Sequence, residues 1–262
     1  MKAVTDNNMR PYNEKITGSI PSVEILGVRV HDITMEQAGA LMCEMALSGM
    51  PHHIIPVNPE MVMMAQVNKE FREVLERASL NLPDGTGILL AARILGLPIR
   101  ERVTGVDTVK MLAGVAARNG LSLFLLGAAP GIAGRVAEIL QKENPGLKIP
   151  GTYAGSPDPS EEDEICSRIE AARPHILLVA YGAPRQELWV ARTMPRLKIP
   201  ITMNVGGTFD FIAGVTTRAP VWLQDAGLEW LYRLAREPHR WRRMLKLPQF
   251  GAAVLREKFL TG

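Results

Sequence analysis

The chain has 262 residues, a mass of 28.8 kDa and a formal net charge of +3. This length fits one α/β domain with an appendage and is enough to bury a substantial core. Its longest apolar runs are interrupted by Gly, Pro or charge well before the roughly 20 residues that a membrane span needs, so we expect no transmembrane helix. Residues 1–21 are polar and lack the apolar core of a secretory signal, and we expect a disordered leader on a cytoplasmic protein.

Charge and cysteine content constrain the partners. Residues 218–262 carry nine Lys or Arg and four Asp or Glu, a net charge of +5, which leaves −2 for the remainder. A basic tail on a mildly acidic body predicts an anionic partner for the tail: phosphate, a lipid headgroup or nucleic acid. Cys43 and Cys166 have no partner at a metal-ligand spacing, so we expect two free thiols.

From Val23 onward, short β-like runs alternate with amphipathic stretches of helical length, which is typical of parallel strands joined by crossover helices. The predicted strands are 23–30, 53–57, 80–82, 121–126, 149–153, 176–181 and 201–205. The predicted helices between them are 35–48, 59–78, 87–95, 107–119, 132–144, 160–172 and 186–197. The pattern predicts an α/β fold with a Rossmann-like, mostly parallel sheet and flanking helices. Ligands bind such sheets at the carboxyl ends of the strands.

Two strands lead into the motifs Asn58-Pro59-Glu60 and Pro83-Asp84-Gly85-Thr86-Gly87. Asn and Asp at such positions are often helix caps or turn residues, and this interpretation stays open for both. Asp84 is favoured as functional because Pro83 and Gly85 fix a tight turn in apolar surroundings. Burial there would raise the pKa of the carboxyl group and suit it to act as a base.

A third strand runs into the small-residue turn Gly127-Ala128-Ala129-Pro130-Gly131. Turns of this kind let backbone approach phosphate at a helix N-terminus. The turn lacks the GxGxxG pattern and the acidic residue of a dinucleotide site, so a nicotinamide cofactor is poorly supported. A plain tight turn and a nucleotide contact at Gly127 both stay open.

The segment Tyr181 to Glu187 places a phenol, a guanidinium, an amide and a carboxylate directly after a strand. This density of hydrogen-bonding groups suits a sugar or a nucleotide. The candidate binding residues are Tyr181, Arg185, Gln186 and Glu187. The alternative is that Arg185 and Glu187 are solvated residues of the first helical turn.

The last strand is followed by Gly206-Gly207-Thr208-Phe209-Asp210. Paired glycines after a strand indicate a close approach of backbone to a ligand, and Asp210 or Thr208 is suited to hold a ribose or base. Capping of a helix by Thr208 is the competing interpretation.

The tail from residue 218 is predicted to be helical. Arg233, Arg236, Arg240 and Arg243 recur at spacings of three and four, which places them on one face if the helix continues through Pro238. A solvated basic face is the usual meaning of such a run. The Trp residues interspersed with them favour a helix at a membrane interface, and the absence of a known reader motif argues against nucleic acid.

Together these motifs resemble the WecG/TagA/CpsF glycosyltransferases, glycosyltransferase family twenty-six. The resemblance extends from about residue 25 to residue 250. Besides the motifs above, it rests on Arg102-Val103-Thr104-Gly105-Val106-Asp107, Arg218-Ala219-Pro220 and Gly227-Leu228-Glu229-Trp230-Leu231-Tyr232-Arg233-Leu234.

The resemblance implies an inverting enzyme that needs no metal and no cofactor and transfers N-acetylmannosamine from a UDP donor to GlcNAc on undecaprenyl diphosphate, for a surface polysaccharide or teichoic acid. It implies a catalytic domain over residues 22–217 and a basic, Trp-rich appendage over 218–262 that completes the active site at the inner face of the membrane. Asp84 matches the general base and Asn58 and Gln186 match pocket residues. The diphosphate-binding arginines are matched by Arg233, Arg240 and Arg243. Thr86, Gly127, Gly206, Gly207 and Asp210 complete the predicted substrate-binding set.

One position departs from the family, whose members often carry Thr where this chain has Pro56, so a hydroxyl contact is missing there. The alternative donors are UDP-N-acetylmannosaminuronic acid, whose carboxylate would need a cation such as Arg102 or Arg185, and UDP-glucose. Away from a membrane, the apolar surface exposed when the tail detaches is expected to favour a homo-oligomer.

Overall fold

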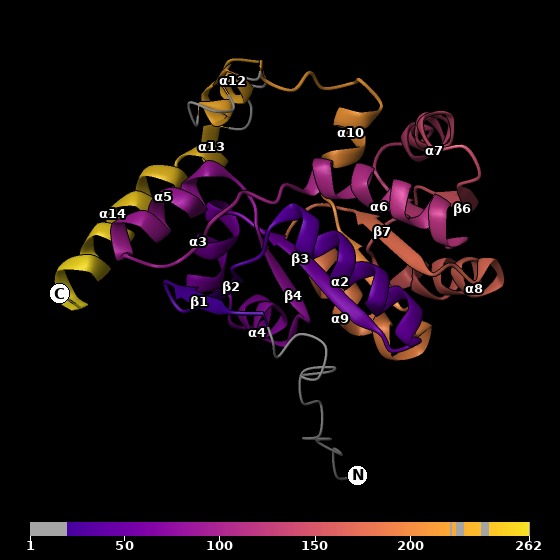
Figure 1. Ribbon diagram of the computed structural model, residues 1–262, viewed down its shortest axis with the longest axis horizontal. Coiled ribbons are helices and arrows are strands. Elements are labelled where there is room, and N and C mark those ends of the chain that lie inside the picture. Colours follow the sequence, from indigo (N-terminus) through magenta and orange to yellow (C-terminus); the bar gives the residue numbers. More distant parts are fainter. Residues whose placement is uncertain (1–19, 221, 224–227, 237–240, 262) are drawn as a thin grey trace, which may run out of the picture.

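The computed structural model describes residues 20–220, 222–223, 228–236 and 241–261. Its centre is a six-stranded parallel sheet (Figure 1) with the strand order β4-β3-β8-β7-β5-β6. The strands are β3 (His52–Val57), β4 (Leu80–Pro83), β5 (Ser122–Gly127), β6 (Lys148–Tyr153), β7 (Ile176–Ala180) and β8 (Ile201–Asn204). The predicted α/β class and parallel sheet are confirmed.

Helices cover both faces of the sheet (Figure 1). One face carries α2 (Met35–Ser48), α6 (Gly105–Asn119), α7 (Ile132–Glu143) and the short α10 (Thr208–Ile212). The opposite face carries α3 (Pro59–Val67), α4 (Lys69–Arg77), α5 (Thr86–Leu95), η1 (Pro159–Glu161), α8 (Glu162–Ala172) and α9 (Arg185–Leu197).

The central strands are buried on both sides, as a parallel sheet between two helical layers requires. In β7, Ile176 and Leu178 pack in the cluster under α2, α6 and α7, whereas Leu177 and Val179 pack under α8 and α9. Successive side chains therefore supply two separate apolar cores, and the continuous apolar run of this strand is explained.

Three details of the predicted elements are wrong. The expected strand over 23–30 is a hairpin of β1 (Ser22–Ile25) and β2 (Val28–His31). Its turn residues Leu26 and Gly27 have φ of 51° and 70°, the positive values of a tight hairpin turn. The expected helix over 59–78 is interrupted at Asn68, whose extended backbone and side-chain bond to the Phe71 N–H start α4. The third error is that α10 was not predicted.

The helical tail is only partly an appendage. It contains α12 (Glu229–Arg236), α13 (Trp241–Met244) and α14 (Lys246–Thr261). The last helix runs along α3 and α5 (Figure 1), and its Phe250 and Val254 are buried in the same cluster as Val57. The C-terminal helix is thus joined to the core of the sheet domain. The proposed boundary between 217 and 218 stays a prediction, and the expected leader lies outside the described residues except for Ile20 and Pro21.

Gly127 provides a test of the packing at the end of β5. Its φ is +100°, and a Cβ atom there would lie 2.8 Å from the carbonyl carbon of Ala180. Because both the backbone strain and the clash oppose a side chain, Gly127→Ala is expected to lower the free energy of unfolding by about 2 kcal/mol or more, measured by chemical denaturation. The control is Gly134→Ala in α7, where a Cβ meets nothing within 4 Å and helix propensity favours Ala. Equal stability of the Gly127 variant and the wild type would contradict this account.

Candidate functional site

A crevice is expected where the chain segments that follow neighbouring strands diverge to opposite faces of the sheet. This happens around the end of β8. The segment after β8 leads to α10, which packs with α6 and α7, whereas its neighbours β3 and β7 lead to α3 and α9 on the other face. The predicted motifs that follow β3, β7 and β8 therefore lie together at the carboxyl ends of the strands.

Asp84 lies at the same end of the sheet, directly after β4. Its backbone N–H donates to the carbonyl oxygen of Val57 at 2.9 Å, and its carboxylate accepts a hydrogen bond from the N–H of Gly105. The turn also packs tightly on the motif that follows β3, since a Cβ on Gly87 would lie 2.6 Å from the ring of Pro59. The two motifs that follow β3 and β4 form a single packed unit.

The surroundings of Asp84 raise the pKa of its carboxyl group from 3.8 to about 7. Burial contributes most, and the negative charge of Glu229 adds to it. Arg102, Arg218 and the N–H of Gly105 act in the opposite direction. The carboxyl group is therefore able to exchange a proton near neutral pH, as a general base requires.

A charge network surrounds this carboxyl group. Arg218 makes a bidentate pair with Asp107, at 2.8 and 3.0 Å, and Thr104 also donates to Asp107. Glu229 in α12 lies 3.7 Å from Arg102 and 3.8 Å from Arg218. The tail thus contributes a carboxylate to the site, and two guanidinium groups stand beside the candidate base.

Asp107, Arg218 and Glu229 were not among the predicted site residues, and Arg102 was considered only as a cation for a uronic acid donor. All four belong to motifs that carry the family resemblance. The pairing of Arg218 with Asp107 spans 111 positions, and no local pattern reveals a contact of that range.

Asn58 is a helix cap, as one of the two interpretations held. Its side-chain oxygen accepts from the Met61 N–H at 3.1 Å. Thr86 is the first residue of α5 and is partly exposed next to Asp84.

Gly127 and Tyr181 have structural roles that the geometry explains. Gly127 permits the contact between the ends of β5 and β7 described above. The ring of Tyr181 is buried at 6.0 Å from that of Trp189, edge to face, among the side chains under α8 and α9. Burial raises the pKa of its hydroxyl group. Arg185 is exposed and donates to the carbonyl oxygen of Tyr181. Substrate contacts by these three residues stay predictions.

Gln186 joins two loops. Its side-chain oxygen accepts from the backbone N–H groups of Gly182 and Gly206, at 2.9 and 3.1 Å. Its side-chain nitrogen donates to Glu187 at 2.8 Å. Glu187 is fully buried, and burial raises the pKa of its carboxyl group to about 7. The interpretation of Glu187 as a solvated first-turn residue is therefore wrong.

The segment after β8 comes close to Asp84. Gly207 precedes α10, and the carbonyl oxygen of Asp210 in that helix accepts from Val215 and Thr216. A Cβ on Gly105 would lie 3.3 Å from the hydroxyl oxygen of Thr208 and 3.7 Å from Pro56. The N–H of Gly105 hydrogen bonds to Asp84, and the segment that follows β8 borders the space beside Gly105.

The side chains of the three arginines assigned to the diphosphate lie outside what the structure describes. Arg240 lies outside the described residues, and the side chains of Arg233 in α12 and Arg243 in α13 are likewise not described. Among the residues that the structure describes, no group of three or more His, Cys, Asp or Glu side chains is arranged to hold a metal ion. Both cysteines are free, as expected.

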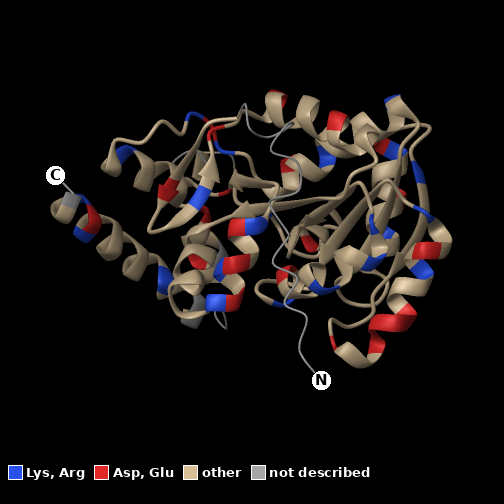
Figure 2. Ribbon diagram, turned by 90° about the horizontal axis from the view of Figure 1, so that it is seen from below, with Lys and Arg blue, Asp and Glu red and all other residues tan. Residues whose placement is uncertain are grey.

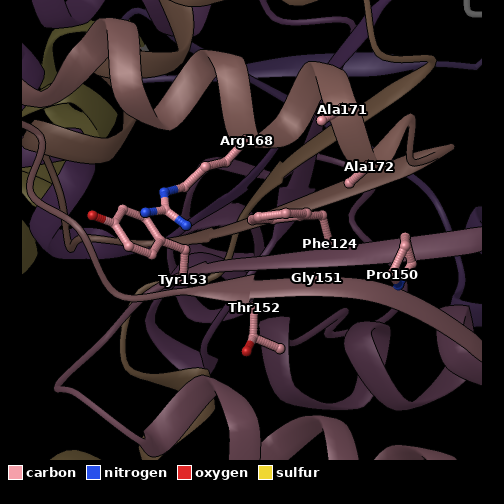
Figure 3. A pocket seen from close by; sticks show the side chains of 8 residues that line it. All are labelled: Phe124, Pro150, Gly151, Thr152, Tyr153, Arg168, Ala171 and Ala172. Carbon is pink, nitrogen blue, oxygen red and sulfur yellow. The ribbon is translucent and has the colours of Figure 1, made fainter.

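A shallow hollow lies elsewhere on the surface, away from Asp84 (Figure 3). It lies between β6 and α8 and is lined by Phe124, Tyr153 and Arg168, with the guanidinium carbon of Arg168 4.4 Å from the centre of the Tyr153 ring. Because β6 and β4 form opposite edges of the sheet, this hollow is not part of the site at Asp84.

Comparison with known proteins agrees with the family resemblance found in the sequence. Residues 23–262 match the model of the "Glycosyl transferase WecG/TagA/CpsF family". An N-acetylglucosaminyldiphosphoundecaprenol N-acetyl-beta-D-mannosaminyltransferase of Bacillus subtilis is 33% identical over 207 residues, 78% of this chain and 79% of the relative. The enzyme of the same name from Staphylococcus aureus is 28% identical over 240 residues, 90% and 93% of the two chains.

The charge network predicts how the pKa of Asp84 responds to substitution. Removing the negative charge of Glu229 by Glu229→Gln stabilises the ionised form of Asp84, so the pKa of its carboxyl group is expected to fall below the wild-type value of about 7. Carboxyl-carbon NMR titration of labelled aspartate measures this, with Asp84→Asn to assign the signal. An unchanged or higher pKa in the Glu229 variant would contradict the network.

Proposed function

The chain belongs to the WecG/TagA/CpsF family of glycosyl transferases, and we propose that it transfers N-acetylmannosamine from UDP-N-acetylmannosamine to GlcNAc linked to undecaprenyl diphosphate. The names of its relatives give that sugar and that acceptor. The observation that carries the proposal is the partly buried carboxyl group of Asp84. Its pKa is about 7, and two guanidinium groups lie beside it.

In the proposed reaction, ionised Asp84 accepts the proton of the attacking GlcNAc hydroxyl group. The hydroxyl oxygen forms a bond to the anomeric carbon of the donor as the bond from that carbon to UDP breaks, which inverts the configuration. Negative charge develops on the leaving diphosphate and needs nearby cations. Arg102 and Arg218 are the described cations beside Asp84, and Arg233, Arg240 and Arg243 are proposed to add to them.

The proposed mechanism uses these cations instead of a metal ion. The names of the relatives favour the neutral donor over the uronic acid.

We further propose that the tail holds the enzyme on the inner face of the membrane as a peripheral protein. Large apolar side chains are exposed along it, among them Trp222 at 67% and Phe259 at 84%. Exposed aromatic rings next to basic residues suit an anionic headgroup region. Over the body, Figure 2 shows Lys and Arg mixed with Asp and Glu. No helix within the described ranges has the length and apolar composition to cross a bilayer.

Release of UDP tests the transfer reaction. We expect turnover that depends on a polyprenyl-diphosphate-GlcNAc acceptor, is indifferent to a chelator, and has an acid limb near pH 7 because Asp84 must be ionised. Asp84→Asn should lower kcat by about 100-fold or more, the usual contribution of a general base. The matched control is Asp163→Asn, whose side chain is exposed in α8. Absence of turnover with every UDP-sugar tried on lipid membranes would refute the proposal.

Vesicle sedimentation tests the membrane role. Full-length protein is expected to bind vesicles that contain phosphatidylglycerol, with an affinity that falls as salt is raised. The double substitution Trp222→Ser and Phe259→Ser should weaken binding by about tenfold or more. Val67→Ser is the control, because Val67 is equally exposed but lies on α3, outside the tail. Equal loss in both proteins would argue against a specific role for the tail.

A further inference from the structure

The side chain of Gln186 has only one orientation that satisfies its partners. One end receives the N–H groups of both Gly182 and Gly206, and an atom that accepts from two donors must be the amide oxygen. The amide nitrogen therefore points the other way and needs an acceptor. Oε1 of Glu187, 2.8 Å away, is that acceptor.

The two glycines belong to loops that diverge. Gly182 follows β7 and leads into α9, while Gly206 follows β8 and leads into α10 on the opposite face. Both have positive φ, 79° and 50°, and Gln186 is itself almost fully buried in the first turn of α9. A single amide group therefore links the three segments at the point where the crevice opens.

Glu187 is placed to fix this amide. It is fully buried, and its second carboxyl oxygen has no hydrogen-bond partner among the described residues. If the amide of Gln186 rotated by half a turn, its N–H groups would face those of the two glycines, and its oxygen would face Glu187. The acceptor at Glu187 therefore favours the orientation that holds the loops together.

The linked loop leads to the candidate base. Gly206 is followed closely by Thr208, whose hydroxyl oxygen would lie 3.3 Å from a Cβ atom on Gly105, and the N–H of Gly105 hydrogen bonds to Asp84. A shift of the β8 loop would therefore change the surroundings of Gly105, whose N–H hydrogen bonds to the carboxyl group.

We infer that Glu187 is a positioning residue for the transfer reaction, which acts through the amide of Gln186 to hold the β7 and β8 loops against each other next to Asp84. It does so as a hydrogen-bond acceptor, without contact to substrate. This inference rests on the proposed function for its kinetic consequence, but its structural part does not.

Two substitutions of Glu187 separate acceptance of a hydrogen bond from other roles. Glu187→Gln keeps an acceptor oxygen and nearly the same shape, whereas Glu187→Met keeps similar volume without a strong acceptor. We expect Glu187→Gln to retain kcat within about threefold, and Glu187→Met to lower kcat by about tenfold or more with less effect on KM for the donor. Glu73→Met on the exposed face of α4 is the control for loss of a carboxylate.

Hydrogen exchange of glycine amides tests the structural part without any activity. In 15N-glycine-labelled wild type, the N–H groups of Gly182 and Gly206 are expected to be protected. Protection should fall by about tenfold in Glu187→Met and persist in Glu187→Gln. If Glu187→Met is poorly folded, Glu187→Leu is the second variant, since it also lacks an acceptor for the amide of Gln186, and the same loss of protection is expected.

The outcomes are distinguishable. Unchanged protection and kcat in Glu187→Met would overturn the inference, as would equal damage by Glu187→Gln and Glu187→Met. A wild type that is inactive with every donor, yet shows the expected pattern of amide protection, would refute the proposed function and leave the positioning of Gln186 by Glu187 standing.

Discussion

A carboxyl group held partly out of water between one carboxylate and two guanidinium groups is the constraint on which this site depends. The backbone of Asp84 is fixed to β3, its carboxylate to the start of α6, and its electrostatic partners come from Arg102, Arg218 and Glu229. Since these groups are far apart in the sequence, the proton affinity of the base is a property of the assembled fold. The turn that carries Asp84 supplies only its position.

Much of the fold was predictable because its signals are local. The helix α2 begins and ends where expected, between a capping box at Thr34 and a left-handed Gly49, and the buried parallel strands read as short apolar runs. The errors arose where one residue interrupts an otherwise uniform pattern. Leu26 adopts a positive φ within an apolar run, which is uncommon for Leu. Asn68 starts a new helix, and although Asn is a favoured helix cap, the continuous helical period on both sides hid this boundary.

The site was predictable in position but not in its interactions. The strand ends rich in Asn, Asp and Gly lie together at the carboxyl end of the sheet, as the parallel topology requires, and Asp84 could be singled out from its tight apolar turn. Only the structure distinguished capping from substrate binding as the role of the Asn58 oxygen, and burial from exposure for Glu187. Both depend on which side of a helix faces the sheet. The pairs of Arg218 with Asp107 and of Glu229 with Arg102 join segments whose proximity only the tertiary fold creates.

The bonds of Gln186 also have a consequence for how an anion is recognised. Glycine-rich loops often present their backbone N–H groups to phosphate, but the N–H groups of Gly182 and Gly206 are already occupied by an internal acceptor. These two N–H groups are therefore not free to bind the diphosphate of the proposed donor, and the arginines proposed to bind it carry that part of the recognition. A backbone N–H group is present whatever the side chain, whereas a guanidinium group is lost on substitution, so this part of the proposed site is sensitive to changes at a few arginines.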